Sequence, residues 1–308
     1  MSLIPQGGHL FEIISRYDDL LAMQGQDDYE PGDTLALIVP FLIRHGLKEA
    51  DIIRLARGAT LTRGAGKLIR CLMGQGWHIF CITTTYQQYA FHVTQRVGIP
   101  HSHVAATAFP LDQFHQTLSA EVANSLAHME HQVLSLASPG DDQAIKQCLD
   151  DFFWTRLPQT ALGQLIKQVK PVGGRRKLLA LEQFCELHGA SLGEFAVVGD
   201  SITDFSMLRA VRDAGGLAIA FNANQYALPH ATVSLASTHL SSLSPILAAW
   251  QSGTLDDVKA LVKQKEASGP CGEREHFHWL IGKTDLEEII ATSQHMRRLV
   301  REKAGELG

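Results

Sequence analysis

Two carboxylates stand at a spacing that could bind a cation. Asp200 follows the apolar run 195–198 and Gly199, and Asp204 comes four residues later, where a helical pattern begins. In parallel α/β sheets, ligands bind at the carboxyl ends of strands, so we expect both side chains at such an edge. Their oxygens suit a hard cation such as Mg²⁺. The alternative is a turn in which Asp204 only caps the next helix.

Three threonines follow a second apolar run. Residues 77–82 predict a buried strand, and Thr83, Thr84 and Thr85 come directly after it. A hydroxyl at a strand end can donate a hydrogen bond to an anion. A β-branched residue in this place can equally have only a structural role. The register among the three threonines stays open.

Basic residues open the helix that precedes the carboxylates. The pair Gly173 and Gly174 leads into Arg175, Arg176 and Lys177. Lys177 could neutralise a phosphate, although a single lysine on a helix is more often a solvated residue. Either arginine could do the same, because a guanidinium matches phosphate oxygens in a bidentate way.

In their order and spacing, these residues resemble the motifs of the haloacid dehalogenase superfamily of phosphatases. Its fourth motif is an apolar strand followed by Gly-Asp-x-x-x-Asp, which matches the segment that holds Asp200 and Asp204. Its second motif, a strand ending in Ser or Thr, matches Thr83, and its third, a Lys near a helix start, matches Lys177. The agreement covers about residues 61–235.

The resemblance implies a role for each matched residue. Asp200 and Asp204 would hold Mg²⁺, and Thr83, Thr84 and Lys177 would bind the phosphoryl group of a small phosphorylated molecule. Thr83 and Lys177 would also act in catalysis, because charge on the transferring phosphoryl oxygens needs stabilisation. We therefore expect Mg²⁺ as the cofactor.

A narrower resemblance concerns the N-terminal region. Residues 14–19 and 31–35 are similar to the helical cap of a phosphoserine-phosphatase-like branch of the superfamily. Some members of that branch are labelled as subunit R of an energy-converting hydrogenase. A hydrogenase role cannot be argued from these residues.

The first motif of such phosphatases is not found. It is a strand that ends in Asp-x-Asp, whose first aspartate attacks phosphorus and whose second acid moves protons. No other aspartate fits this role, because Asp18 and Asp19 lie on a helical face and Asp112 follows the second motif. Asp27 and Asp28 lie in a polar turn, and Asp33 is typical of a helix N-cap. Loss of a nucleophile can cost about six decades in turnover. We expect either a start further upstream or a chain without turnover.

The expected fold is α/β, a doubly wound parallel sheet of the Rossmann-like, haloacid-dehalogenase type with an α-helical cap. Apolar runs at 77–82, 104–109, 195–198, 217–221 and 232–235 alternate with helical patterns, which favours a parallel sheet covered on both faces. We predict a helical cap over residues 1–60 and a core over 61–252 with a helical insertion at about 111–170. A helical extension would cover residues 253–308.

Composition limits the classes of partner. The 308 residues include 27 Lys and Arg against 32 Asp and Glu, and this balance argues against a nucleic-acid partner. No apolar run is long enough to span a membrane, and the start of the chain lacks the pattern of a signal peptide. Five scattered cysteines indicate reduced thiols in a cytoplasmic protein.

The sequence favours a Mg²⁺-dependent phosphomonoester phosphatase scaffold that is inactive as this chain. The alternative is a non-catalytic regulator that binds a phosphorylated ligand or a partner protein. A nucleotide-binding module is a third possibility, weakened because no glycine-rich loop follows a first strand. Neither the substrate nor the oligomeric state can be deduced from these residues.

Overall fold

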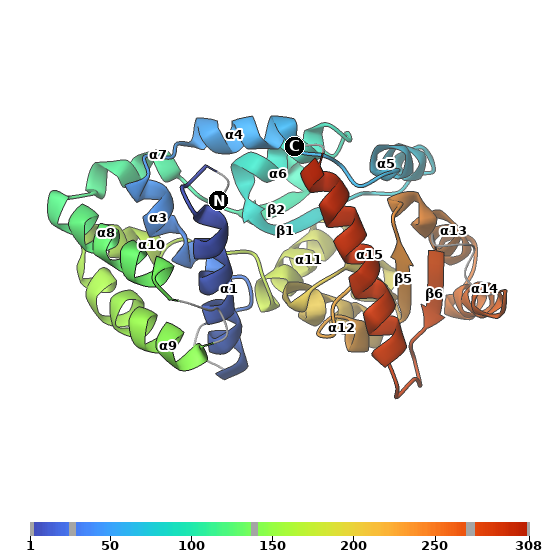
Figure 1. The fold of residues 1–308 in the computed structure, drawn as a ribbon. Coiled ribbons are helices and arrows are strands. Elements are labelled where there is room, and N and C mark those ends of the chain that lie inside the picture. Colours follow the sequence, from blue (N-terminus) through green and yellow to red (C-terminus); the bar gives the residue numbers. More distant parts are fainter. Residues whose placement is uncertain (1–2, 25–28, 137–140, 269–274, 307–308) are drawn as a thin grey trace. The chain divides into compact units, whose positions relative to one another are not determined.

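A computed structural model describes residues 3–24, 29–136, 141–268 and 275–306 (Figure 1). The chain is a mixed α/β protein, mostly helical, and it forms two compact units. The first unit holds residues 1–57, 83–92 and 106–173, and the second holds 58–82, 93–105 and 174–308. Units of close contact need not coincide with domains, so the predicted division into 1–60, 61–252 and 253–308 stays a prediction.

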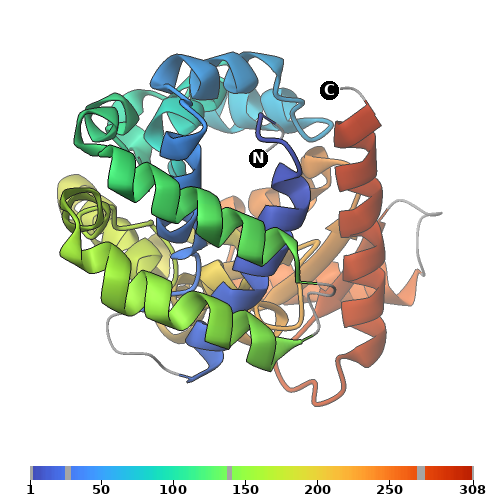
Figure 2. The ribbon, with the colours of Figure 1, turned by 60° about the vertical axis from the view of Figure 1, so that its left-hand side comes forward.

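The two long segments of the first unit, 1–57 and 106–173, are mostly helical. α1 places Leu10, Ile13, Ile14, Tyr17 and Leu21 on one fully buried face, at the spacing of an amphipathic helix. α1, α8 and α9 lie side by side (Figure 2). The helices are α1 (Gly7–Gln24), α2 (Thr34–Leu37), α3 (Val39–Arg44), α4 (Glu49–Gly58), α7 (Leu111–Phe114), α8 (Ala120–Leu134), α9 (Asp142–Asp150), α10 (Ala161–Ile166), the 3-10 helices η2 (His115–Thr117) and η4 (Leu157–Gln159), and the π-helix η3 (Asp151–Arg156).

The second unit contains a four-stranded sheet in the order β3-β4-β5-β6. β3, β4 and β5 are parallel, and β6 is antiparallel to β5. The strands are β3 (Ala196–Gly199), β4 (Leu217–Phe221), β5 (Val233–Ser237) and β6 (Glu275–Trp279). The sequence predicts the first three strands within a residue or two, because each is a short apolar run bounded by turn residues.

Helices pack on both faces of this sheet. Leu217 and Ile219 of β4 join one apolar core with α5, α13 and α14, whereas Ala218 and Ala220 join another with α11, α12 and α15. The alternation follows from the two-residue period of a strand. The helices are α5 (Ala65–Gly74), α11 (Arg175–His188), α12 (Phe205–Asp213), α13 (Ser244–Ser252), α14 (Leu255–Ala267), α15 (Glu287–Glu306), and the 3-10 helices η1 (His101–His103), η5 (Leu192–Glu194), η6 (Ile202–Asp204), η7 (Leu228–His230) and η8 (Leu240–Leu243).

The expected single sheet is divided. β1 (Cys81–Tyr86) and β2 (Val104–Thr107) form a separate two-stranded sheet, with α6 (Gln87–Gln95) between them in the chain. The predicted strand at 77–82 is wrong by four residues, because Phe80 packs in an aromatic cluster with His103 and Phe184 before pairing begins. The β-branched threonines, predicted to follow the strand, lie within it.

The C-terminal region is not helical throughout, contrary to the prediction for residues 253–308. β6 lies between α14 and α15 and pairs with β5, so that Val233 stands opposite Trp279. Phe277 and Trp279 are buried, and the residues between and before them are partly exposed. This two-residue alternation is typical of an edge strand with one buried face.

Candidate ion-binding site at the end of β3

The close fit of Gly199 against Asp204 shapes the end of β3. Gly199 is the last residue of the strand and pairs with Ala220 of β4. A Cβ atom at position 199 would lie 2.6 Å from the Asp204 Cβ and 2.9 Å from its Cγ. Glycine therefore allows the loop 200–204 to fold back so that the Asp204 side chain covers the strand end.

Asp204 is buried and receives hydrogen bonds on both carboxylate oxygens. Its Oδ2 accepts from the backbone N–H groups of Asp200 at 2.9 Å and Ser201 at 3.0 Å, and from the Ser201 hydroxyl at 3.2 Å. Its Oδ1 accepts from the Lys177 ammonium at 2.7 Å. The alternative in which Asp204 only caps the next helix is wrong, because its side chain makes no capping hydrogen bond to α12 and instead forms a capping box with Ser201 on η6.

Lys177 and Asp204 form a buried ion pair. Their side chains are 8% and 6% exposed. Burial raises the pKa of the Asp204 carboxyl, but the Lys177 ammonium and the two backbone donors outweigh it, so that the pKa lies below its ordinary value. The Asp204 carboxyl is therefore ionised at neutral pH.

Two further contacts fix Lys177 near this strand end. The N–H of Gly174, just before α11, donates to the carbonyl of Thr203 at 2.9 Å and so ties the start of the helix to the loop. The Lys177 charge also acts on the thiol of Cys81, at the beginning of β1, although burial has the larger effect and raises the pKa of that thiol.

Asp200 differs from Asp204 in its exposure and in its partner. Its side chain is 50% exposed, and its Oδ2 lies 2.9 Å from Nη2 of Arg297 on α15. The Asp200 carbonyl accepts from Arg297 Nη1 at 2.7 Å and from the Asn224 N–H at 2.9 Å. Sequence reasoning missed Arg297, because nothing in the pattern of a charged C-terminal helix marks one arginine among several.

Two predicted site residues, Thr83 and Thr84, belong to the first unit. Lys177, Asp200 and Asp204 belong to the second. The Thr83 hydroxyl accepts from the Thr85 N–H at 3.3 Å, and the Thr84 carbonyl accepts from the Thr107 hydroxyl at 2.5 Å. The structure thus brings three of the five predicted site residues together. The position of Thr83 and Thr84 relative to those three stays a prediction.

The carboxylates differ in how well they fit Mg²⁺. Mg²⁺ keeps several waters and is usually held by one or two carboxylates together with phosphate oxygens. The half-exposed Asp200 fits this role, while both oxygens of Asp204 already accept from donors. No group of three or more potential metal-binding side chains converges among the described residues. The assignment of Asp204 as a direct ligand stays a prediction.

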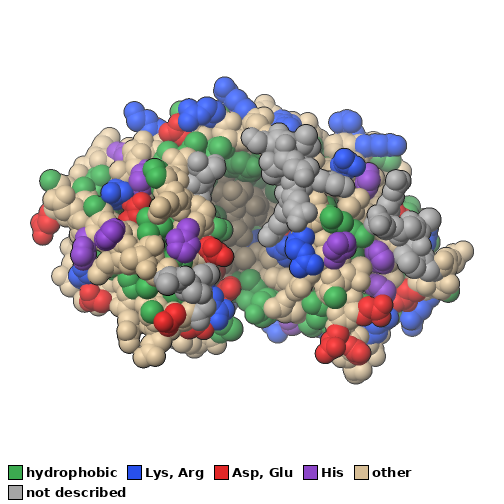
Figure 3. All heavy atoms as spheres, viewed as in Figure 1, with side chains coloured by type: hydrophobic (Ala, Val, Ile, Leu, Met, Phe, Trp, Pro, Cys, Tyr) green, Lys and Arg blue, Asp and Glu red, His purple; other side chains and the backbone are tan. Residues whose placement is uncertain are grey.

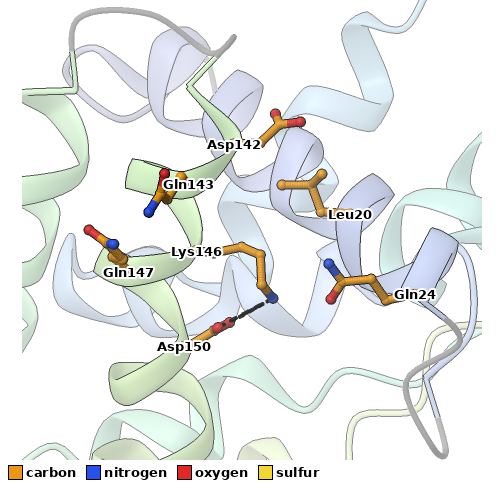
Figure 4. Close-up of a pocket in the computed structure, with 7 residues that line it drawn as sticks. All are labelled: Leu20, Gln24, Asp142, Gln143, Lys146, Gln147 and Asp150. Atoms are coloured by element: carbon orange, nitrogen blue, oxygen red, sulfur yellow. Dashed lines mark hydrogen bonds and ion pairs between the residues drawn. The ribbon is translucent and has the colours of Figure 1, made fainter.

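A second polar site lies in the first unit, in a pocket of about 500 Å³ between α1 and α9. Lys146 and Asp150 point toward each other in it, and their charged atoms lie 3.2 Å apart (Figure 4). Asp150 also accepts a hydrogen bond of 2.5 Å from the buried Tyr17 hydroxyl. No pattern in the sequence indicates this site, because its residues come from helices distant in the chain.

Acidic and basic side chains are interspersed over the face shown in Figure 3. Within the described ranges, no helix combines the length and the apolar character needed to cross a membrane. The expected absence of a nucleic-acid partner and the expected cytoplasmic location stay predictions.

Comparison with known proteins gives a structural likeness without a family. No protein-family model and no curated protein sequence matches this chain. The structure is similar to that of gene product AF1437 from Archaeoglobus fulgidus, with a TM-score of 0.82 and 29% sequence identity. The likeness covers 97% of this chain and 90% of that one, so nearly the whole arrangement of helices and sheets is shared.

Proposed function

We propose that this chain binds a small phosphomonoester together with Mg²⁺ at the carboxyl end of β3, on a scaffold of the haloacid dehalogenase type, and does not hydrolyse it. The observation that carries the proposal is the buried Lys177–Asp204 ion pair next to the half-exposed Asp200. The parallel register of β3 with β4 supports it, because ligands of parallel sheets bind beyond the carboxyl ends of the strands.

Each residue has a stated part in this proposal. Asp200 would hold the cation, and Mg²⁺ would neutralise charge on the phosphoryl oxygens. Asp204 orients Lys177, whose ammonium has three donors and gives one to the Oδ1 of Asp204. Thr83 and Thr84 would donate to the phosphoryl group. A doubly wound core with a helical cap is the arrangement that this proposal implies.

Binding without turnover is proposed of residues 1–308, in which no apolar strand ends in Asp-x-Asp. Two of the N-terminal aspartates have local hydrogen-bond partners, and Asp27 and Asp28 lie outside the described residues. Asp18 accepts from the Tyr29 hydroxyl at 2.6 Å and from the Thr34 N–H at 3.0 Å, and Asp33 accepts from the Glu30 N–H at 3.1 Å. These bonds tie both carboxylates to the segment between α1 and α2.

The test is calorimetric titration of the purified full chain with Mg²⁺, and then with inorganic phosphate in saturating Mg²⁺. We expect Asp200→Asn to weaken Mg²⁺ binding about tenfold or more, because it removes the charged ligand. Asp213→Asn is the matched control, since Asp213 is also an aspartate paired with an arginine, Arg212, and is 59% exposed. Equal Mg²⁺ affinity in the wild type and in Asp200→Asn would contradict the proposal.

An activity assay separates binding from hydrolysis. We expect no release of phosphate from p-nitrophenyl phosphate in Mg²⁺ by the purified chain. Turnover that Asp200→Asn abolishes would instead favour the Mg²⁺-dependent phosphohydrolase. The regulator that binds only a partner protein would show neither Mg²⁺ binding nor phosphate binding.

A further inference from the structure

The C-terminal helix α15 brings an arginine to the end of β3. α15 contacts β5, and it buries Ile289, Ser293 and Met296 against the second unit. Arg297 follows on the next position and keeps only 18% of its side chain exposed. The packing of the helix thus brings this guanidinium to the end of β3.

The guanidinium binds Asp200 in two ways at once. One terminal nitrogen donates to the backbone carbonyl at 2.7 Å and the other lies 2.9 Å from the carboxylate. Such a planar fork is the geometry with which arginine also holds the oxygens of a phosphate. A lysine would offer one nitrogen in place of two that are held in a rigid plane.

A loop supports the same arrangement from the other side. The N–H of Asn224 donates to the Asp200 carbonyl at 2.9 Å, and the next residue, Gln225, accepts from Gln294 of α15 at 2.9 Å. The loop therefore contacts both the strand end and the helix that carries Arg297. Through these contacts, α15 forms part of the structure at this end of the sheet.

We infer that Arg297 couples the binding of Mg²⁺ to the binding of a phosphorylated ligand. Without Mg²⁺, Arg297 neutralises Asp200. A dication bound to Asp200 repels the guanidinium and replaces it as the partner of the carboxylate. The same guanidinium can then bind phosphate oxygens. The inference rests on the proposed function and deepens it, because it makes the anionic ligand and Mg²⁺ each raise the affinity for the other.

The test compares Arg297→Met with the wild type by the same two titrations. Methionine keeps the apolar length of the side chain and removes its charge. We expect Mg²⁺ alone to bind roughly threefold or more tightly, because a competing cation is gone. In saturating Mg²⁺ we expect inorganic phosphate to bind about tenfold or more weakly, because a charge-assisted contact is lost. Opposite changes for the two ligands are the signature of the coupling.

Arg298→Met is the control, because Arg298 is the exposed neighbour of Arg297 on the same helix. Should Arg297→Met fail to fold, Arg297→Lys serves as the second variant. It keeps the charge and loses the fork, and we expect weaker phosphate binding from it as well. Circular dichroism checks the fold of each variant.

The outcomes separate this inference from the proposed function. If the wild type binds Mg²⁺ and Arg297→Met gives the same affinities as Arg298→Met in both titrations, the role of Arg297 is overturned and the proposed function stands. A wild type that binds no Mg²⁺ would overturn both. A change in Arg297→Met of the same sign for Mg²⁺ and phosphate would overturn the coupling.

Discussion

Two buried aspartates, one in each unit, show opposite electrostatic behaviour. Asp18 of the first unit is 7% exposed and Asp204 of the second is 4% exposed. Burial raises the pKa of Asp18, and the hydrogen bonds from Tyr29 and Thr34 offset this only in part. The same burial effect at Asp204 is outweighed by Lys177, and the pKa there is lowered. The difference lies in the charge of the partner.

The comparison shows what a buried carboxylate needs in order to remain ionised. Neutral donors satisfy the oxygens of Asp18, but they supply no net charge to compensate for lost solvation. At Asp204, the Lys177 ammonium supplies both a hydrogen-bond donor and a compensating charge. The first unit therefore uses its aspartate as an acceptor that joins α1 to the segment before α2, whereas the second unit maintains a fixed pair of charges beside an exposed carboxylate.

The largest expected effect comes from removing the charge of Asp204. Asp204→Asn leaves the Lys177 ammonium buried without a counter-charge, and breaking a buried pair in this way costs about 3–5 kcal/mol. We expect a loss of that order in the free energy of unfolding, measured by urea denaturation. Hydrogen exchange should show the lost protection in peptides of β3 and α12 and not in those of α1.

A double substitution sharpens this result. Lys177→Met together with Asp204→Asn removes both charges and keeps an oxygen for the N–H groups of Asp200 and Ser201. We expect the double variant to be more stable than Asp204→Asn alone, with a coupling energy of about 0.5–3 kcal/mol. Additive losses would show that the ion pair is not what stabilises the loop.

Acid should reproduce part of the effect of Asp204→Asn. Because the folded-state pKa of Asp204 lies below its ordinary value of 3.8, the carboxylate contributes stability above about pH 4. That contribution is lost as the pH falls through the folded-state pKa. We expect urea midpoints of the wild type to fall more steeply with acidification than those of Asp204→Asn. Parallel curves would contradict the assignment.

A smaller effect is expected from filling the space at Gly199. A Cβ there would lie 2.6 Å from the Asp204 Cβ, so Gly199→Ala must displace the loop and should cost about 1–3 kcal/mol. Gly74→Ala is the control, because Gly74 is the last residue of α5 and has open space around its missing Cβ. A Gly199→Ala protein as stable as the control would mean that Asp204 does not need this close approach.

Local patterns account for what the sequence could predict. The end of β3 was found because an apolar run, a glycine and an aspartate are adjacent in the chain, and each has a local meaning. β6 was missed although Phe277 and Trp279 alternate with polar residues, because charged helical segments surround it on both sides. The sequence predicts the threonines of β1 after the strand, because the apolar run before them has the pattern of a strand.

Long-range contacts account for what it could not predict. Lys177 and Asp204 were both expected at one site, but their ion pair depends on how the loop folds over Gly199. Arg297 and Asp200 are 97 residues apart in the chain. The helical pattern does not predict which residue of a helix will contact the end of a strand. The pocket that contains Lys146 and Asp150 depends in the same way on the packing of α1 against α9.

The smallest effect is expected at Asp18, and it tests the comparison most directly. Asparagine keeps the Oδ1 that accepts from Tyr29 and Thr34 and removes a charge that burial disfavours. Because the folded-state pKa of Asp18 is raised, the wild type should lose stability as the pH rises from its unfolded-state pKa to its folded-state pKa. We expect Asp18→Asn to abolish that loss and to change stability at neutral pH by less than about 1 kcal/mol, or to raise it. A loss as large as that of Asp204→Asn would show that Asp18 has a cationic partner of its own and that the two units treat their buried carboxylates alike.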